Sequence, residues 1–278
     1  MGREQRRLLI DSDRLQRAPS GLVALTPAES RYLVKVLRYA PGALFAICDG
    51  AGGLWEAELV GPERAQLRQP LEAPLAWQPP PTPPVVLLAA LVKRDYEVVL
   101  RMAVELGADW LLPCRGDYDA VAGQPNLERW RTIAREAAEQ CERPWLPQLL
   151  DPRPARAWLA TDPLSPLGTL SPDAAKAPSP ATFPRESSPS SLRMVASTRQ
   201  SGALPLLAAL DSWTATEAPA SLWLACGPEG GWSGAEEGLA RDQGWIPVDL
   251  GPRILRSSTA AVAGLGLLSD WRYRRWGC

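Results

Sequence analysis

The sequence predicts an α/β protein in two parts: a small β-rich module, then a larger parallel sheet covered by helices. Alternating hydrophobic runs around a glycine cluster predict a β-hairpin in the first part. In the second part, continuous apolar runs alternate with amphipathic helical patterns, the order of β-α-β units. AWQPPPTPP at 76–84 predicts a stiff proline-rich linker. We therefore expect one domain at 1–75 and another at 85–278.

The N-terminal module contains one predicted helix and one predicted hairpin. TPAESRYLVKVLRYAPG begins with a helix-capping signal at Thr26 and Glu29, and hydrophobic residues follow at helical spacing. ALFAICDG and LWEAELVG alternate in hydrophobicity on either side of the glycines at 50–53, so we expect them to pair as antiparallel strands.

The second domain opens with the clearest alternation of strand and helix. VVLLAALV (85–92) is a continuous apolar run, as in a strand that is buried on both faces. RDYEVVLRMAVELG predicts a helix that ends at Gly107, and ADWLLP predicts the next buried strand. NLERWRTIAREAAEQCE is strongly amphipathic and predicts a second covering helix.

The alternation of predicted strands and helices is interrupted once and then resumes. Residues 151–191 are dominated by Pro, Ser and Ala, which predicts a disordered or loosely ordered insertion with no catalytic role and with its low-complexity part at 161–191. LRMVAST, SLWLAC and WIPVDL then predict strands. We expect helices around 203–211, after Ser233, and from about Ser257 to Tyr273.

The composition excludes several classes of protein. The 278 residues are 46% hydrophobic and 22% charged, as is usual for a soluble globular protein. No apolar run is long enough for a membrane span or a signal peptide, so we expect a cytoplasmic protein without a membrane partner. The five cysteines include no Cys-x-x-Cys pair, so the sequence predicts no metal site and no disulfide framework.

The chain contains no histidine. This excludes Ser-His-Asp and Cys-His hydrolase sites and histidine-containing zinc sites. Any acid-base chemistry must come from Asp, Glu, Lys, Tyr or Cys, from the substrate or from water.

Basic residues gather near both ends although the net charge is only −1. Residues 1–17 contain five arginines against three acidic residues, and residues 253–275 contain five arginines against Asp270 alone. Two basic segments on a neutral chain could bind phosphates of a nucleic acid. A general preference for arginine over lysine explains the same pattern without any function.

Two Gly-Pro turns follow predicted strands near the C-terminus. In CGPEGG (226–231) the glycines permit positive φ and a close approach of the backbone to a ligand. Such a turn at the carboxyl end of a parallel strand is where open α/β sheets bind ligands. It matches neither the dinucleotide fingerprint nor the Walker A motif. It could also be an ordinary strand-to-helix turn, with Ser233 as N-cap and Glu236 completing a capping box.

The second turn, LGPRILRSSTA (250–260), combines a tight turn with two arginines. The forked guanidinium groups of Arg253 and Arg256 suit contacts with a phosphate or a nucleobase. The hydroxyl residues Ser257, Ser258 and Thr259 are predicted to cap the last helix.

In this order the two turns resemble the paired signature of SPOUT-class methyltransferases, specifically the bacterial 16S rRNA uracil-N3 methyltransferase family. KRDYEVVLRMAVELGADWLLP and LERWRTIAREAAEQCERPWLP resemble two further segments of that family. RYLVKVLRYAPG resembles its N-terminal RNA-binding domain. The resemblance covers nearly the whole chain except 161–191.

The resemblance implies a PUA-like β-barrel followed by an α/β domain with a C-terminal deep trefoil knot. It also implies a homodimer that uses S-adenosylmethionine to methylate N3 of a uridine in the 16S rRNA of the small ribosomal subunit. The residues that it assigns to the cofactor are Cys226, Gly227, Pro228, Glu229, Gly230, Gly231, Leu250, Gly251, Arg253, Ile254 and Leu255.

The reaction needs an aligned methyl donor and an unpaired uracil that has lost its N3 proton. Arg256 is the first candidate to stabilise the uracil anion, and Arg94 with Asp95 are the second candidates. Arg256 could instead be a surface ion-pair partner. The candidate RNA-binding residues are Arg3, Arg6, Arg7, Arg31, Lys35 and Arg38.

The chain departs from the family at particular positions. Ser258 stands where the family usually has Glu before the Thr of its last signature, and Arg31 and Tyr32 stand at histidine-like positions. Two alternative functions follow: a non-catalytic RNA-binding or ribosome-assembly protein on the same fold, and a methyltransferase for another RNA nucleotide. An α/β domain without a ligand is the remaining alternative.

Overall fold

The computed structural model forms two compact units, Met1–Pro80 with Arg135–Leu146, and Pro81–Ala134 with Pro147–Cys278. Arg3, Cys278 and most of the predicted insertion at 161–191 lie outside the described residues. The structure describes residues 6–18, 20–119, 121, 123–161, 190–198, 200 and 202–277.

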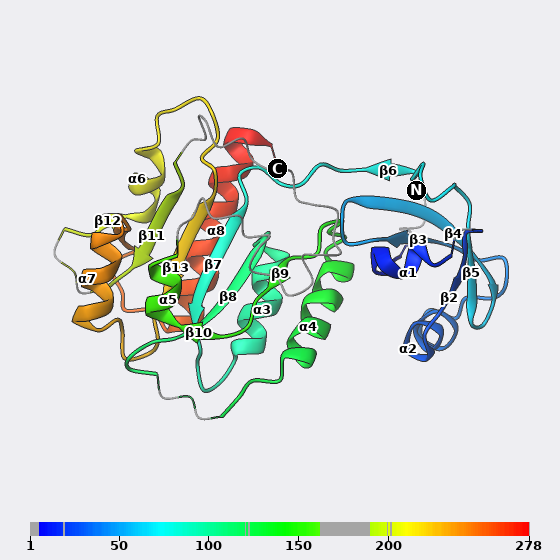
Figure 1. Cartoon of the computed structure of the whole chain (residues 1–278), viewed down its shortest axis with the longest axis horizontal. Coiled ribbons are helices and arrows are strands. Elements are labelled where there is room, and N and C mark those ends of the chain that lie inside the picture. Colours follow the sequence, from blue (N-terminus) through cyan, green and yellow to red (C-terminus); the bar gives the residue numbers. More distant parts are fainter. Residues whose placement is uncertain are drawn as a thin grey trace. The chain divides into compact units, whose positions relative to one another are not determined.

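The first unit is built on a six-stranded sheet in the order β1-β3-β4-β5-β2, with β6 paired to β4 (Figure 1). The predicted hairpin is confirmed: β3 and β4 pair antiparallel, from Leu44↔Glu58 to Cys48↔Leu54. Alternate residues of β4 are buried, so one face of the hairpin forms the core. The strands are β1 (Arg7–Leu9), β2 (Leu22–Ala24), β3 (Leu44–Cys48), β4 (Gly53–Gly61), β5 (Arg64–Leu67) and β6 (Ala76–Trp77).

Two short helices complete this unit, and the sequence predicted one of them. Helix α2 (Pro27–Arg31) begins with the capping box expected from Thr26 and Glu29. It continues into a π-helical turn, η1 (Tyr32–Val36), in which Leu33 is buried. The other helix, α1 (Ser12–Gln16), was not predicted, since one buried leucine in five residues gives no periodicity.

The second unit contains an eight-stranded sheet in the order β10-β8-β7-β13-β11-β14-β12, with β9 paired to β8. All pairings between its described strands are parallel, as predicted. The strands are β7 (Val85–Ala90), β8 (Trp110–Arg115), β9 (Gln148–Leu149), β10 (Arg153–Pro154), β11 (Leu192–Ala196), β12 (Leu204–Pro205), β13 (Leu222–Cys226) and β14 (Ile246–Asp249).

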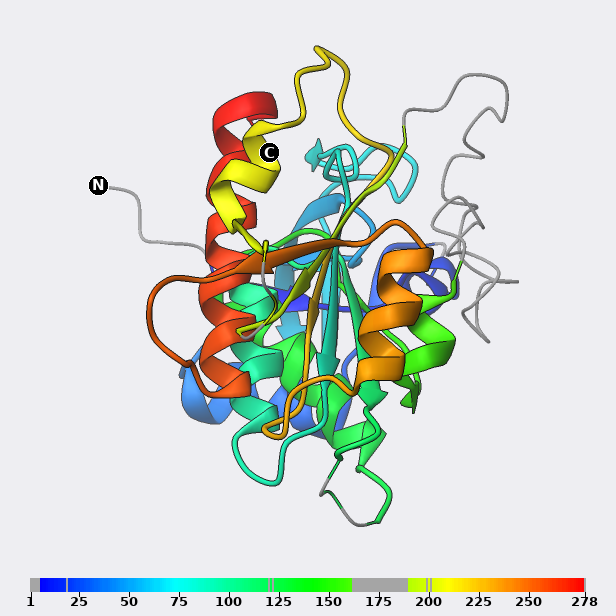
Figure 2. The same cartoon turned by 90° about the vertical axis from the view of Figure 1, so that its left-hand side faces the viewer.

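Helices cover both faces of this sheet, as Figure 2 shows. On one face α8 (Ser257–Trp276) packs against β7 and β13 and beside α3 (Tyr96–Glu105) and α6 (Leu206–Asp211). On the other face α5 (Ala155–Leu159) packs against α7 (Gly234–Asp242). The expectation of disorder is wrong for residues 153–159, because β10 and α5 form there and Trp158 is fully buried.

The remaining helix, α4 (Leu127–Gln140), belongs to the second unit up to Ala134 and to the first from Arg135. Among the described residues, no helix combines the length and the apolar character that a membrane span requires.

A buried ion pair fixes α8 to the sheet. The guanidinium of Arg272 lies 2.7 Å from Oδ2 of Asp109, and the same oxygen accepts a hydrogen bond from the N–H of Val85. Arg272 also donates to the carbonyl of Gly107, and its side chain is only 5% exposed. Because a buried charge requires such partners, the position of α8 on this face is strongly specified.

Candidate active site

The strand order places both Gly-Pro turns at the same edge of the second sheet. Strands β13 and β14 both run parallel to β11, which lies between them. The turn at 226–231 follows β13, and the turn at 250–255 follows β14. Both turns therefore emerge at the carboxyl ends of the strands, where open α/β sheets bind ligands.

The first turn presents backbone rather than side chains. A Cβ atom on Gly227 would lie 3.0 Å from the ring of Trp232, and one on Gly230 would lie 2.9 Å from Cβ of Tyr118. Gly231 has a φ of +78°, which disfavours other residues. Glu229, Gly230 and Gly231 are exposed. Gly227 and Gly230 are therefore closely packed against Trp232 and Tyr118, while residues 229–231 are exposed to solvent.

The residues flanking the first turn are fixed. The side chain of Ser233 accepts from the N–H of Glu236, and Glu236 accepts from the N–H of Ser233, so the predicted capping box is confirmed. The indole of Trp232 donates to the carbonyl of Ala196 at the end of β11. Burial raises the pKa of Cys226 to about 12, so its side chain is a neutral thiol rather than a nucleophilic thiolate.

The second turn is more exposed. Gly251 has a φ of +116° and donates its N–H to Oδ1 of Asp249. Arg253 and Ile254 are exposed, and 73% of the surface of Ile254 is accessible. Leu250 lies close to Gly264 of α8. An exposed isoleucine at the carboxyl edge of the sheet is available to contact a ligand or another chain.

Ser257 connects the two turns, and here the capping prediction is wrong. The N-cap of α8 is Arg256, and no side chain caps this helix. The hydroxyl of Ser257 instead donates to the carbonyl of Gly227 at 2.5 Å. The first residue of α8 therefore holds the second turn against the first.

Arg256 is exposed, directly before α8. No ion pair of Arg256 is found within the described parts of the chain, so nothing there supports the alternative of a surface ion-pair partner. Its guanidinium group is free to bind an anion beside the second turn.

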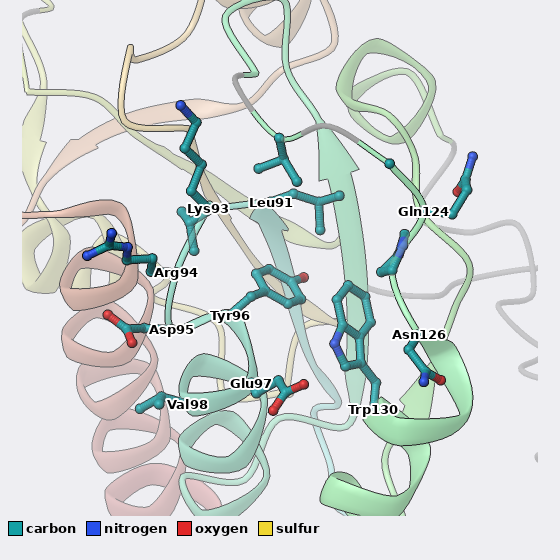
Figure 3. Close-up of a pocket in the computed structure, with 14 residues that line it drawn as sticks. Leu91, Lys93, Arg94, Asp95, Tyr96, Glu97, Val98, Gln124, Asn126 and Trp130 are labelled. Atoms are coloured by element: carbon teal, nitrogen blue, oxygen red, sulfur yellow. The ribbon is translucent and has the colours of Figure 1, made fainter.

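Arg94 and Asp95 line a cavity of about 430 Å³ between the end of β7 and the starts of α3 and α4 (Figure 3). Both are exposed, and Asp95 adopts a φ of +67° immediately before α3. Tyr96 and Trp130 face each other in Figure 3, and their ring centroids are 4.7 Å apart. No residue of either Gly-Pro turn lines this cavity, so it is distinct from the pair of turns.

The candidate RNA-binding residues fall into two groups. Arg31, Lys35 and Arg38 are exposed along α2, η1 and the residues that follow, with no ion pair to another described residue. Arg7, in contrast, forms an ion pair of 2.8 Å with Glu142. Arg6 is exposed, and Arg3 lies outside the described residues.

One element that reaches the first turn was not predicted from the sequence. The loop 116–119 follows β8, and its Asp117 accepts a hydrogen bond from Ser233. The available signal was its place directly after a predicted buried strand, at the edge where the other turns emerge.

Comparison with known proteins identifies the family. Residues 78–269 match the family model described as an RNA methyltransferase domain, and residues 25–68 match the RNA methyltransferase PUA domain. The chain is 34% identical over 255 residues to ribosomal RNA small subunit methyltransferase E of Synechocystis sp., covering 89% of this chain and 72% of that protein. It is 30% identical over 264 residues to the protein of that name from Mycobacterium tuberculosis, covering 91% and 89%.

Solved structures share the fold. A probable rRNA-methyltransferase from Porphyromonas gingivalis has a TM-score of 0.74 at 18% identity, covering 97% of this chain and 99% of that one. Ribosomal RNA small subunit methyltransferase E from Neisseria gonorrhoeae, solved with S-adenosyl methionine, has a TM-score of 0.69 at 22% identity, covering 96% and 98%. The chain therefore belongs to the RNA methyltransferase family that includes ribosomal RNA small subunit methyltransferase E, with a PUA-like domain before its α/β domain.

Proposed function

We propose that this protein transfers a methyl group from S-adenosylmethionine to N3 of a uridine in 16S rRNA. The observation that carries the proposal is the pair of turns joined by Ser257 and Gly227, because both turns then lie together at the edge of the sheet where open α/β sheets bind ligands. The relatives named as small subunit rRNA methyltransferases supply the substrate class.

The glycine turn at 227–231 fits the cofactor. Its exposed residues 229–231 would bind the ligand through main-chain groups, and the second turn at 250–255 would form the facing wall. When bound, the cofactor supplies an electrophilic methyl group. The protein has to align the uracil with this group and keep water away from both.

Arg256 is the proposed catalytic residue. Uracil N3 loses a proton during the reaction, and a guanidinium group beside the base would stabilise the resulting anion. Since the chain has no histidine, the proton leaves to a carboxylate or to water. Arg94 and Asp95, which line the separate cavity, are the second candidates.

Four finer features belong to the same proposal: a closed β-barrel in the N-terminal unit, a trefoil knot in the second, a homodimer and a cytoplasmic location. The strand order supports the knot. Strand β13 is inserted between β7 and β11, which precede it in the chain, and α8 then returns to pack on β7 and β13. A ribosomal substrate supports the location.

The deciding experiment uses small ribosomal subunits from a strain that lacks this gene. They are incubated with the purified protein and labelled S-adenosylmethionine, and the modified nucleoside is identified by mass spectrometry. We expect labelled 3-methyluridine in 16S rRNA, and a loss of turnover with retained cofactor affinity for Arg256→Ala.

The other outcomes separate the alternatives. Cofactor binding without methyl transfer would favour a non-catalytic RNA-binding or ribosome-assembly protein, for which Ser258 in place of the usual glutamate is the motivating observation. Methylation of a different nucleoside, in 16S rRNA or in tRNA, would favour a methyltransferase with another target.

A further inference from the structure

The loop 116–119 after β8 makes several contacts with the segment that carries the glycine turn. The N–H of Asp117 donates to Oε1 of Glu236 at 2.9 Å, and Oδ2 of Asp117 accepts from the hydroxyl of Ser233 at 2.5 Å. Tyr118 lies against Gly230: a Cβ atom added at Gly230 would be 2.9 Å from Cβ of Tyr118. Two elements far apart in sequence are thus joined at the proposed cofactor site.

Glu236 makes this connection stiff. Glu236 is 1% exposed, and its two carboxylate oxygens accept one N–H each, from Asp117 and from Ser233. Ser233 follows the glycine turn directly and begins α7. Because buried carboxylates are strongly stabilised by such donors, the end of the turn is held in one position relative to the loop.

Arg156 of α5 fixes Asp117 from a third element. Its guanidinium lies 2.5 Å from Oδ2 of Asp117, the oxygen that also accepts from Ser233. Hydrogen bonds from Arg156 and Ser233 hold the pKa of Asp117 below its usual value, so the carboxylate is ionised at neutral pH. The oxygen is therefore a charged acceptor for both donors.

We propose that Asp117 is a positioning residue for the cofactor: through Ser233 and Glu236 it holds the turn 227–231 in the conformation that binds S-adenosylmethionine. In this role it acts through its protein partners and not by contact with the methyl group or the uracil. The inference rests on the proposed function, because it takes this turn as the cofactor site. It adds a residue that lies outside both Gly-Pro turns.

The test is cofactor affinity, measured by calorimetry on the full-length protein without RNA. Asp117→Ala removes the acceptor for Ser233 and Arg156 but keeps the backbone bond to Glu236. We expect the Kd for S-adenosylmethionine to rise by about 5- to 30-fold, less than two fully buried charged hydrogen bonds would give, because the side chain of Asp117 is 33% exposed. In methyl transfer assays, the KM for the cofactor rises in parallel, while kcat at saturation changes little.

The matched control is Asp119→Asn in the same loop. Asp119 bonds to Arg115 and to the N–H of Val121. Since neither partner belongs to the glycine turn, Asp119→Asn should leave the Kd for the cofactor within about twofold of the wild-type value. Arg156→Gln provides a second variant at an exposed side chain if Asp117→Ala does not fold. It keeps the carboxylate but removes its charged partner, so we expect a smaller rise in Kd than the alanine would give.

The outcomes are distinguishable. A rise in Kd for Asp117→Ala or Arg156→Gln, with none for Asp119→Asn, supports the positioning role. A folded Asp117→Ala protein that binds the cofactor as tightly as the wild type overturns it while leaving the proposed function intact. Absence of cofactor binding in the wild type itself would overturn both.

Discussion

Gly230 is the position where the identity of a single residue most directly limits the glycine turn. A methyl group there would lie 2.9 Å from Cβ of Tyr118, a distance that real Cβ atoms essentially never show. Tyr118 belongs to the loop held by Asp117 and cannot withdraw without disturbing that loop. The glycine is required by close packing, since its own φ is not positive.

Gly230→Ala is therefore expected to displace the turn and to weaken cofactor binding by about tenfold, since overpacking typically costs about 1–3 kcal/mol. The measurement is calorimetric titration with S-adenosylmethionine. Gly238→Ala in α7 is the control, because nothing lies within 4 Å of its added Cβ. That variant should keep the affinity and gain about 0.5–1 kcal/mol in stability from helix propensity. Equal affinities for S-adenosylmethionine in the wild type, Gly230→Ala and Gly238→Ala would contradict the prediction.

Ser257→Ala tests the connection between the two turns. Losing the hydroxyl leaves the carbonyl of Gly227 without its donor, at a cost of about 1–2 kcal/mol or a 5- to 30-fold loss of cofactor affinity. Ser257→Thr keeps the hydroxyl and should retain much of the affinity. Thr259→Ala is the control at an exposed neighbour. If Ser257→Ala binds the cofactor normally, the bond does not organise the site.

At the scale of an element, α2 shows how a cap and an ion pair act together. The guanidinium of Arg14 donates to both carboxylate oxygens of Glu29, at 2.6 and 2.9 Å. Glu29 also accepts from the N–H of Thr26 in the capping box. Burial raises the pKa of Glu29, but the bonds from Arg14 and Thr26 outweigh it and lower the pKa below its usual value.

A lowered pKa in the folded state predicts a definite pH dependence. Ionised Glu29 contributes to the free energy of unfolding. This contribution is fully present above the unfolded-state pKa of about 4.3 and is lost as the pH falls through the lower folded-state pKa. Glu29→Gln should therefore reduce the free energy of unfolding by about 1–2 kcal/mol at pH 7, and the difference should vanish in acid. Urea unfolding across this pH range measures it, with exposed Glu63→Gln as control. A difference that does not change with pH would exclude an ionic origin.

Elements with a strong pattern were predicted, and elements without one were not. The apolar run of β7 and the amphipathic α4 occur where the sequence placed them, because burial on both faces or on one stripe leaves a clear pattern. Strand β1 and helix α1 are three and five residues long and carry no such pattern. The π-helical turn η1 continues a predicted helix with a different bonding pattern that periodicity cannot reveal.

The candidate site was predictable to a similar degree. The two turns could be placed because each follows a buried strand of one parallel sheet. Their connection through Ser257 could not, because a serine before a helix favours capping and only the packed structure offers it the carbonyl of Gly227. Asp117 was missed for the same reason: its partners Ser233 and Arg156 are 116 and 39 residues away in the chain.

At the scale of the whole molecule, cofactor binding and RNA binding are expected to be separable. The Gly-Pro turns belong to one compact unit, whereas Arg31, Lys35 and Arg38 belong to the other. These three basic side chains are exposed and have no ion pair within the described residues. They are therefore available to neutralise phosphates without losing partners in the protein.

The triple variant Arg31→Ala, Lys35→Ala and Arg38→Ala should weaken binding to a 16S rRNA fragment, most strongly at low salt. Each lost phosphate contact reduces the slope of log K against log salt by about 0.7–0.9, so three contacts predict a reduction of about 2–3. Fluorescence anisotropy over a series of KCl concentrations measures the slope, and exposed Arg64→Ala in β5 is the control for lost charge.

The affinity for S-adenosylmethionine should stay unchanged, because the substituted side chains lie outside the unit that contains both turns. An unchanged salt slope would mean that RNA binds elsewhere on the protein. A joint loss of cofactor affinity would mean that the two binding functions are coupled.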